Sequence, residues 1–237
     1  MCAASTERSV APPLIITIDG PAGTGKTTVA RALAKRLDLL VLDTGAMYRA
    51  SALIALRESL DPSDGVALAV RIGELGISFD FSKVPPAIHL DGMDVGGEIR
   101  SSEVESIVSI VAAQPEVRRA LVEEQRSIAQ AHPRLVTEGR DQGSIVFPDA
   151  SVRFFLTASV ETRAGRRCDQ VEASGEQAVL ADVHEAIATR DQLDETRPDG
   201  PLVCPDGAII VDTSKLSFEE VIDRLEADVR LQIGGAE

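Results

Sequence analysis

Aromatic side chains and positive charge are both scarce in this sequence. It has no tryptophan, no asparagine and only 3% aromatic residues, so it hardly allows the row of aromatic side chains on which single-stranded nucleic acids stack. The 24 lysines and arginines face 38 acidic residues, which gives a net charge of −14. This charge opposes binding to nucleic acid or to an anionic membrane. Any phosphate site must therefore be a local cluster of arginine in an acidic protein.

Cysteine, histidine and long apolar runs are also rare. Cys2, Cys168 and Cys204 make no C-x-x-C pair, and the three histidines do not stand at zinc-binding spacing. The apolar run at residues 14–18 is far too short to span a bilayer. Residues 1–12 lack the apolar core of a signal peptide. We therefore expect a cytoplasmic protein in a reducing compartment, with residues 1–12 as a disordered tail.

Short apolar runs punctuate the chain and predict strands. They lie at residues 14–19, 39–42, 135–137, 152–156 and 208–211. After the first run, Val29, Leu33 and Leu37 recur at helical spacing. A last helix is predicted after Ser217, which opens a capping box with Glu220. Alternating strands and helices of this kind predict a parallel α/β sheet.

Two stretches interrupt this alternation. Residues 77–99 read as three short strands with a turn at Asp91-Gly92, which predicts a small antiparallel insert. Residues 101–132 then read as two helices, the second of which begins at Pro115. Residues 159–200 are polar and rich in arginine, with Ser159 as a helix cap, and we expect a mobile lid there.

A glycine-rich loop joins the first strand to the first helix. Its spacing, Gly20-x-x-x-x-Gly25-Lys26-Thr27, fits the phosphate-binding P-loop template. Glycines let consecutive backbone N–H groups surround phosphates, and the helix N-terminus adds partial positive charge. An ordinary glycine-rich turn is the alternative, but the strand–loop–helix context favours nucleotide binding. The predicted ATP-binding residues are Gly20, Pro21, Ala22, Gly23, Thr24, Gly25, Lys26, Thr27 and Thr28.

Other features indicate which class of P-loop protein this is. A switch GTPase usually reads guanine through Asn-Lys-x-Asp, and this chain has no asparagine. Arginines instead gather at strand ends and in the predicted lid. Phosphoryl transfer between small molecules needs such an arrangement, because cations must bring two polyanions together.

Several blocks of the sequence resemble bacterial cytidylate kinase. Besides the P-loop, they are Leu42-Asp43-Thr44-Gly45-Ala46-Met47-Tyr48-Arg49, Glu138-Gly139-Arg140-Asp141-Gln142-Gly143 and Arg190-Asp191-x-x-Asp194-x-x-Arg197. The resemblance runs from about residue 13 to the C-terminus. It implies a P-loop kinase fold: a five-stranded parallel sheet with helices on both faces, a nucleoside-monophosphate (NMP)-binding insert at about 57–105 and a helical lid at about 159–198, all in one domain of residues 13–237. It also implies transfer of a phosphoryl group from ATP to CMP or dCMP, with Mg²⁺.

The resemblance also implies roles for individual residues. Ser109, Arg118 and Asp141 would hold cytosine, and Tyr48 would lie beside the base or sugar. Arg190 and Asp194 would face the pentose. The acceptor phosphate would be held by Thr44, Arg49, Arg140 and Arg197. Transfer would depend on Lys26, Arg140 and two lid arginines, Arg163 and Arg167. Thr27 would bind Mg²⁺, with Asp43 or Glu138 acting through water. Leu193 and Glu195 stand where the family often has arginine, which makes this lid less basic.

Some alternatives remain open from the sequence. Asp141 could cap a helix, Asp43 could be a strand-end cap or a metal-shell carboxylate, and Arg166 is expected on a solvated face. The rival functions are a P-loop kinase acting on UMP, AMP or shikimate, or a P-loop protein that binds nucleotide without transferring phosphate. The expected partners are small-molecule nucleotides, not nucleic acid or membrane. We expect a monomer, because the site needs no second chain.

Overall fold

A parallel sheet forms the centre of the computed structural model, which describes residues 12–173, 175 and 177–234. Residues 1–11 of the predicted tail lie outside these residues. The strands of the sheet are β1 (Leu14–Asp19), β2 (Leu40–Asp43), β6 (Arg134–Glu138), β7 (Val152–Thr157) and β8 (Ile209–Asp212). They are all parallel and lie in the order β2-β6-β1-β7-β8. The five predicted strands are thus confirmed within about one residue at each end.

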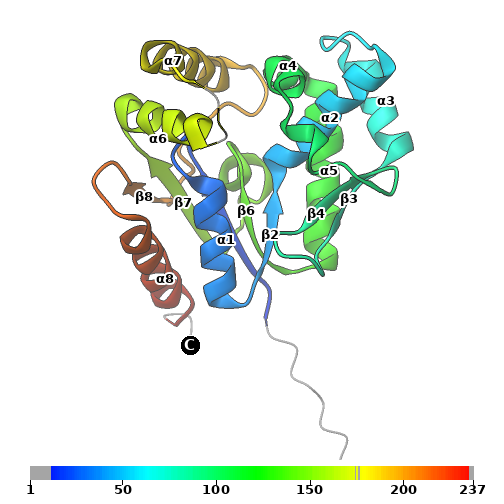
Figure 1. The fold of residues 1–237 in the computed structure, drawn as a ribbon. Helices are drawn as coiled ribbons and strands as arrows, with labels where there is room; N and C mark the ends of the chain where they lie inside the picture. Colours follow the sequence, from blue (N-terminus) through cyan, green and yellow to red (C-terminus); the bar gives the residue numbers. More distant parts are fainter. Residues whose placement is uncertain (1–11, 174, 176, 235–237) are drawn as a thin grey trace, which may run out of the picture.

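Helices cover both faces of this sheet (Figure 1). Helices α1 (Lys26–Leu37) and α8 (Phe218–Gly234) pack together on one face, over apolar side chains of β1 such as Ile16 and Ile18. On the other face lie α2 (Thr44–Glu58) and α5 (Pro115–Ala131). Val41 and Leu42 belong to different cores because successive side chains of a strand point to opposite faces. The predicted fold class is therefore confirmed.

The small antiparallel sheet predicted at residues 77–99 is present between β2 and β6. Helix α3 (Gly65–Leu75) leads into a separate antiparallel sheet of β3 (Ile77–Asp80), β4 (Ala87–Leu90) and β5 (Met93–Asp94). A single turn of 3₁₀ helix, η1 (Glu98–Arg100), then precedes α4 (Ser102–Ala112). Pro115 occupies the first turn of α5, as predicted, where its missing N–H leaves no hydrogen bond unmade.

Two helices lie over the carboxyl ends of the strands, beside the P-loop and facing α4 (Figure 1): α6 (Val160–Ala173) and α7 (Leu180–Thr196). The predicted caps are present, since Ser159 accepts from Thr162 N at 3.2 Å and Ser217 forms a capping box with Glu220. Within the described ranges, no helix is long and apolar enough to cross a membrane.

The turn that follows β6 was not predicted from the sequence. After β6 the chain forms a π-helical turn, η2 (Gln142–Val146). The buried carboxylate of Asp19, at the end of β1, accepts from the backbone N–H groups of Gln142 and Gly143 at 2.8 and 2.7 Å. Asp19 thereby fixes the start of this turn beside the carboxyl end of the sheet.

Candidate active site

A cavity of about 1030 Å³ opens at the carboxyl ends of the parallel strands. Its walls come from the P-loop, α2, α4, the residues after β6, α6 and α7. Ligands of open α/β sheets bind at this edge. The predicted site residues that line the cavity are Ala22, Gly23, Gly25, Lys26, Thr27, Thr28, Thr44, Tyr48, Arg49, Ser109, Glu138, Arg140, Asp141, Arg167, Arg190, Asp194 and Arg197.

The P-loop has the backbone of a phosphate cradle. Gly20 has φ +145°, and a Cβ added there would lie 2.1 Å from the carbonyl oxygen of Leu156, so only glycine fits. Gly25 precedes α1, and no side chain caps the helix or adds negative charge in its first turn. The first N–H groups of α1 are therefore free of a competing side-chain cap. Such a helix N-terminus favours an anion.

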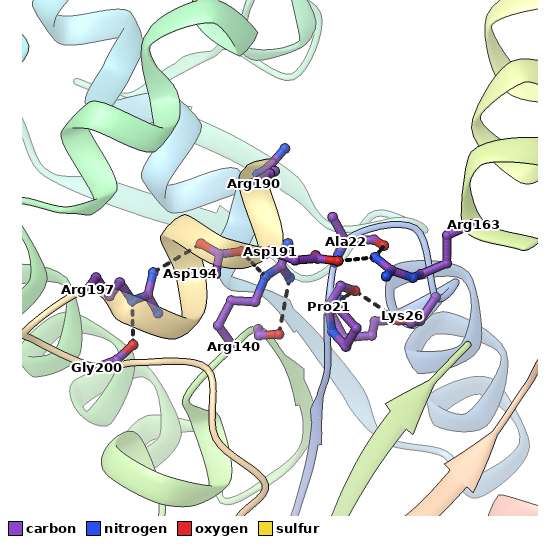
Figure 2. A network of polar contacts seen from close by, with 12 residues as sticks. Pro21, Ala22, Lys26, Arg140, Arg163, Arg190, Asp191, Asp194, Arg197 and Gly200 are labelled. Carbon is purple, nitrogen blue, oxygen red and sulfur yellow. Dashed lines mark hydrogen bonds and ion pairs between the residues drawn. The ribbon is translucent and has the colours of Figure 1, made fainter. Parts of the chain in front are cut away.

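Lys26 is buried and donates from Nζ to the carbonyl oxygen of Pro21 at 2.7 Å. Figure 2 shows this side chain folded back along the loop. Burial and the nearby Arg140 lower the pKa of Lys26. A polyanion in the cavity would favour the charged form of this lysine.

Carboxylates stand beside the first turn of α1. Thr27 donates its hydroxyl proton to Glu138 Oε1 at 2.7 Å. Glu138 is register partner to Asp43 on β2, and burial together with this neighbouring charge raises the pKa of Glu138. Asp43 also caps α2 by accepting from Ala46 N at Oδ1 at 3.0 Å, and its Oδ2 accepts from Arg31 at 3.3 Å. The cap is thus confirmed, and the role of Asp43 as a metal-shell carboxylate stays a prediction.

The predicted phosphate-side arginines are ordered by carboxylates (Figure 2). Arg140 donates from Nε to Asp194 Oδ2 at 2.7 Å, and Arg197 lies 3.6 Å from the other oxygen of Asp194. Arg197 Nη2 is buried and has no hydrogen-bond partner in the structure. Thr44 donates to the carbonyl oxygen of Glu138 at 2.7 Å, which places its hydroxyl on the same cavity wall.

Glu105 is a cavity residue that the sequence analysis did not single out. Its carboxylate accepts from Arg49 Nη2 at 3.2 Å and from Arg190 Nη1 at 3.0 Å. Helix periodicity offered a signal, because Glu105 and Ser109 stand four residues apart and so share one face of α4.

The three residues predicted to hold cytosine come together, but not in the same way. Arg118 and Asp141 form a buried ion pair, each 2% exposed, and Arg118 also donates to the Tyr48 hydroxyl at 3.2 Å. Asp141 and Ser109 line the cavity, whereas Arg118 lies behind its wall. Gly200 is required there, because a Cβ at this position would lie 1.8 Å from Arg118 Nη2. Asp141 makes no side-chain cap to η2, so the helix-cap alternative for Asp141 is wrong.

The lid arginines of α6 do not all point to the cavity. Arg163 is buried and donates to Asp191 and, at 3.0 Å, to the carbonyl oxygen of Ala22, so it holds the P-loop from outside. Arg167 is exposed at the cavity edge. The expectation for Arg166 was wrong: Arg166 donates to Thr213 Oγ1 and O at 3.0 and 2.7 Å, because α6 packs against the end of β8.

Asp191 is a second residue that the sequence analysis missed. Besides pairing with Arg163, it accepts from the backbone N–H of Ala22 at 3.3 Å (Figure 2). It therefore joins α7, α6 and the P-loop. Its position three residues before Asp194 on one helix face was the available signal.

A P-loop at the head of a parallel sheet, with a second group of arginines across one cavity, defines this chain as a P-loop nucleotide-binding protein. A family model described as cytidylate kinase matches residues 16–230. The chain belongs to the cytidylate kinase family.

Individual relatives agree with this assignment. The cytidylate kinase of Caldanaerobacter subterraneus subsp. tengcongensis is 45% identical over 93% of this chain and 96% of its own. That of Rhodococcus jostii is 48% identical over 90% and 93%. A solved structure of an uncharacterized protein from Eubacterium ventriosum aligns with a TM-score of 0.52 over 92% of this chain and 98% of that chain. At 12% identity, this last likeness concerns the fold alone.

Proposed function

We propose that this protein transfers the terminal phosphoryl group of ATP to CMP or dCMP, giving ADP and CDP or dCDP. The observation that carries the proposal is one cavity with a P-loop on one wall and, on the other, Arg49, Arg140 and Arg197 beside the buried Arg118–Asp141 pair. Relatives named cytidylate kinase, 45–48% identical over at least nine-tenths of this chain, support it.

In the proposed reaction a phosphate oxygen of CMP forms a bond to the terminal phosphorus of ATP, and the bond between that phosphorus and the ADP oxygen breaks. The acceptor oxygen is already an anion at neutral pH, so no protein group needs to remove a proton. Positioning and charge neutralisation are then what the protein supplies. The P-loop N–H groups and Lys26 hold the donor phosphates, and Thr44, Arg49, Arg140 and Arg197 hold the acceptor. Arg167, at the cavity edge, neutralises charge at the transferring group.

The residues beside α1 suit Mg²⁺. This ion prefers oxygen ligands and is usually held by one or two carboxylates together with substrate phosphates. The Thr27 hydroxyl, hydrogen-bonded to Glu138, and the adjacent Asp43 provide such a set. Burial and the charge of Asp43 raise the pKa of Glu138, and a cation would favour the ionised form of this carboxyl group. When bound, Mg²⁺ would neutralise charge on the donor phosphates.

Base recognition follows from the chemistry of Asp141. A carboxylate accepts hydrogen bonds, so it suits the exocyclic amino group of cytosine and opposes the carbonyl group of uracil. Ser109 lies on the same wall and can donate or accept. Arg118 keeps Asp141 in place from behind that wall.

We further propose that residues 57–105 form the NMP-binding insert, that residues 159–198 act as the lid, and that the chain works as a cytoplasmic monomer.

The experiment that tests the function is a coupled assay for ADP with ATP, Mg²⁺ and CMP, dCMP, UMP or AMP in turn. CMP and dCMP should give the highest kcat/KM. Lys26→Met should abolish turnover while circular dichroism stays unchanged, because the charge on the donor phosphates is lost. Equal rates with UMP or AMP, or near-normal turnover by the folded variant, would contradict the proposal.

A further inference from the structure

The backbone of Ala22 in the P-loop is held at both of its polar groups by the two helices that lie over the strand ends. Its N–H donates to Asp191 Oδ1 on α7 at 3.3 Å, and its carbonyl oxygen accepts from Arg163 Nη1 on α6 at 3.0 Å (Figure 2). A Cβ built on Gly23 would lie 3.1 Å from Arg163 Cβ, so α6 also packs directly against the loop. The P-loop is therefore fastened to both helices.

Arg163 and Asp191 also fix each other. The second carboxylate oxygen of Asp191 accepts from Arg163, and Arg163 Nε donates to the carbonyl oxygen of Ala158 at 3.0 Å. The two side chains are only 5% and 12% exposed, so water competes little for these bonds. Neither side chain belongs to the wall of the large cavity. The guanidinium of Arg163 is thus bonded to the loop and its supports, outside the space that a nucleotide would fill.

The two bonds to Ala22 restrict the loop before any nucleotide binds. A glycine-rich loop samples many backbone conformations, and fixing its residues costs free energy that a ligand must otherwise supply on binding. Ala22 lies between β1 and α1, so holding it also restricts the N–H groups that follow it in the loop. A loop held in this way should bind a triphosphate more tightly than a loop that is free to move.

From this geometry we propose that Arg163 and Asp191 are positioning residues that hold the P-loop ready for ATP. The inference rests on the proposed function, because it takes the P-loop as the donor site. It gives Arg163 a different role from the one that the sequence resemblance implied, which was a direct part in phosphoryl transfer. Helices α6 and α7 then help to set the affinity for the donor nucleotide.

Asp191→Ala tests the proposal because two explanations predict opposite effects on donor binding. By charge alone, loss of a carboxylate beside the P-loop and release of Arg163 should tighten the binding of a polyanion. If the pair positions the loop, binding should instead weaken about tenfold, since the ligand must then order the loop. Calorimetry with Mg²⁺ and AMP-PNP, a non-hydrolysable ATP analogue, measures the dissociation constant without turnover. CMP affinity should change by less than about twofold, because Asp194 still pairs with Arg140 and Arg197.

Arg163→Met tests the other member of the pair, because it keeps an apolar stem and removes the guanidinium. AMP-PNP binding should weaken by about tenfold or more. The double variant Arg163→Met, Asp191→Ala should lose no more affinity than Arg163→Met alone, because the two side chains act as one unit. With saturating ATP and CMP, kcat should stay within about fivefold of the wild type, since loss of positioning appears in donor binding.

Glu195→Gln is the matched control. Glu195 is exposed on the same helix, so the variant removes a negative charge from the surface of α7, and AMP-PNP affinity should not change. Thermal melts show which variants are folded at the assay temperature. Asp191→Asn, which can still accept from Ala22, should weaken binding less than Asp191→Ala and provides a second variant if the alanine protein does not fold.

Unchanged or tighter AMP-PNP binding by the folded Asp191 variants would overturn the inference. So would a fall in kcat of about a hundredfold in Arg163→Met with AMP-PNP affinity retained, since such a loss is typical of a group that acts on the transferring phosphoryl. The proposed function fails separately, if the wild type binds AMP-PNP but forms no ADP with CMP. The AMP-PNP measurements would still decide whether the pair positions the P-loop.

Discussion

Most of the arginines around the cavity form ion pairs with carboxylates. A chain with a net charge of −14 can therefore contain a local cluster of arginines that suits phosphate. The paired arginines are Arg49, Arg118, Arg140, Arg163, Arg190 and Arg197. Each pair fixes a guanidinium that would otherwise sample many rotamers, and it limits repulsion between neighbouring arginines. The site is thus preorganised for anions without a broad positive surface.

Asp141→Asn tests base recognition at the residue scale. An amide offers one acceptor oxygen and a donor in place of the carboxylate, so it fits cytosine less well and tolerates uracil better. We expect kcat/KM for CMP to fall at least about tenfold, the scale of one lost hydrogen bond to a charged group. Activity with UMP should fall less or rise. Steady-state kinetics with both monophosphates measures the ratio of kcat/KM for CMP to kcat/KM for UMP.

A control must separate recognition from folding, because the change leaves the buried Arg118 without its main partner, which is destabilising. Thermal melts show whether the variant is folded at the assay temperature. Asp199→Asn removes a carboxylate that lies 3.9 Å from Arg118 on a half-exposed side chain, and it should leave the ratio unchanged. An unaltered CMP-to-UMP ratio in folded Asp141→Asn would exclude Asp141 from base recognition.

At the scale of elements, α6 presents arginines to different neighbours. Arg163 and Arg166 fasten the helix to the P-loop and to the end of β8, whereas Arg167 lies at the cavity edge and makes no ion pair within the described ranges. The helix therefore combines anchoring side chains with one that is available to a ligand. These arginines have different partners because successive side chains of a helix point in different directions from its axis.

Arg167→Ala and Arg166→Ala should separate these tasks. We expect Arg167→Ala to lower kcat by about a hundredfold, the scale of removing one donor to a transferring group, with little effect on CMP affinity or melting temperature. Arg166→Ala should instead lower the free energy of unfolding by about 1–2 kcal/mol, because its hydrogen bonds to Thr213 are lost. Kinetics, CMP calorimetry and urea unfolding of both variants distinguish the effects. Loss of CMP affinity with kcat retained would place Arg167 in the acceptor site.

At the scale of the whole molecule, the buried carboxyl group of Asp19 makes the free energy of unfolding depend on pH. Burial raises the pKa of Asp19 from 3.8 to about 6, although the N–H groups of Gly143 and Gln142 act in the other direction. The folded protein therefore binds this proton more tightly than the unfolded chain. This tighter proton binding adds to the free energy of unfolding. The contribution is present in full below about pH 4 and is lost as the pH rises through about 6.

Urea unfolding of the wild type and Asp19→Asn between pH 4.5 and 7.5 tests this linkage. Relative to the variant, the wild type should lose about 2 kcal/mol of unfolding free energy across the interval, because about 1.5 pH units separate pH 4.5 from the folded pKa of about 6 and one pKa unit corresponds to about 1.36 kcal/mol. The asparagine can still accept from one backbone N–H, so the variant should remain folded. If the unfolding free energies of the two proteins changed with pH in parallel, Asp19 would not titrate in this interval.

Local patterns were sufficient to predict the strands, the caps and the P-loop. Ser159 and Ser217 cap helices through residues three positions away, and Gly20 and Gly25 shape a loop between adjacent elements. Strand positions follow from apolar runs, because burial on both faces requires them. In such features the sequence specifies the backbone within a few residues, so spacing alone carries the information.

The sequence by itself therefore determined the sheet, the phosphate loop and most of the residues around the cavity. Only the tertiary structure decided which side chains pair: Arg118 with Asp141, Arg163 with Asp191, and Glu105 with Arg49 and Arg190. These partners stand 23 to 85 residues apart, and helical or strand periodicity says nothing across such separations. The distance and angle at which α4, α6 and α7 pack over the strand ends bring the charges within hydrogen-bonding reach. That packing turned Arg163 and Arg166 away from the cavity and placed Glu105 inside it.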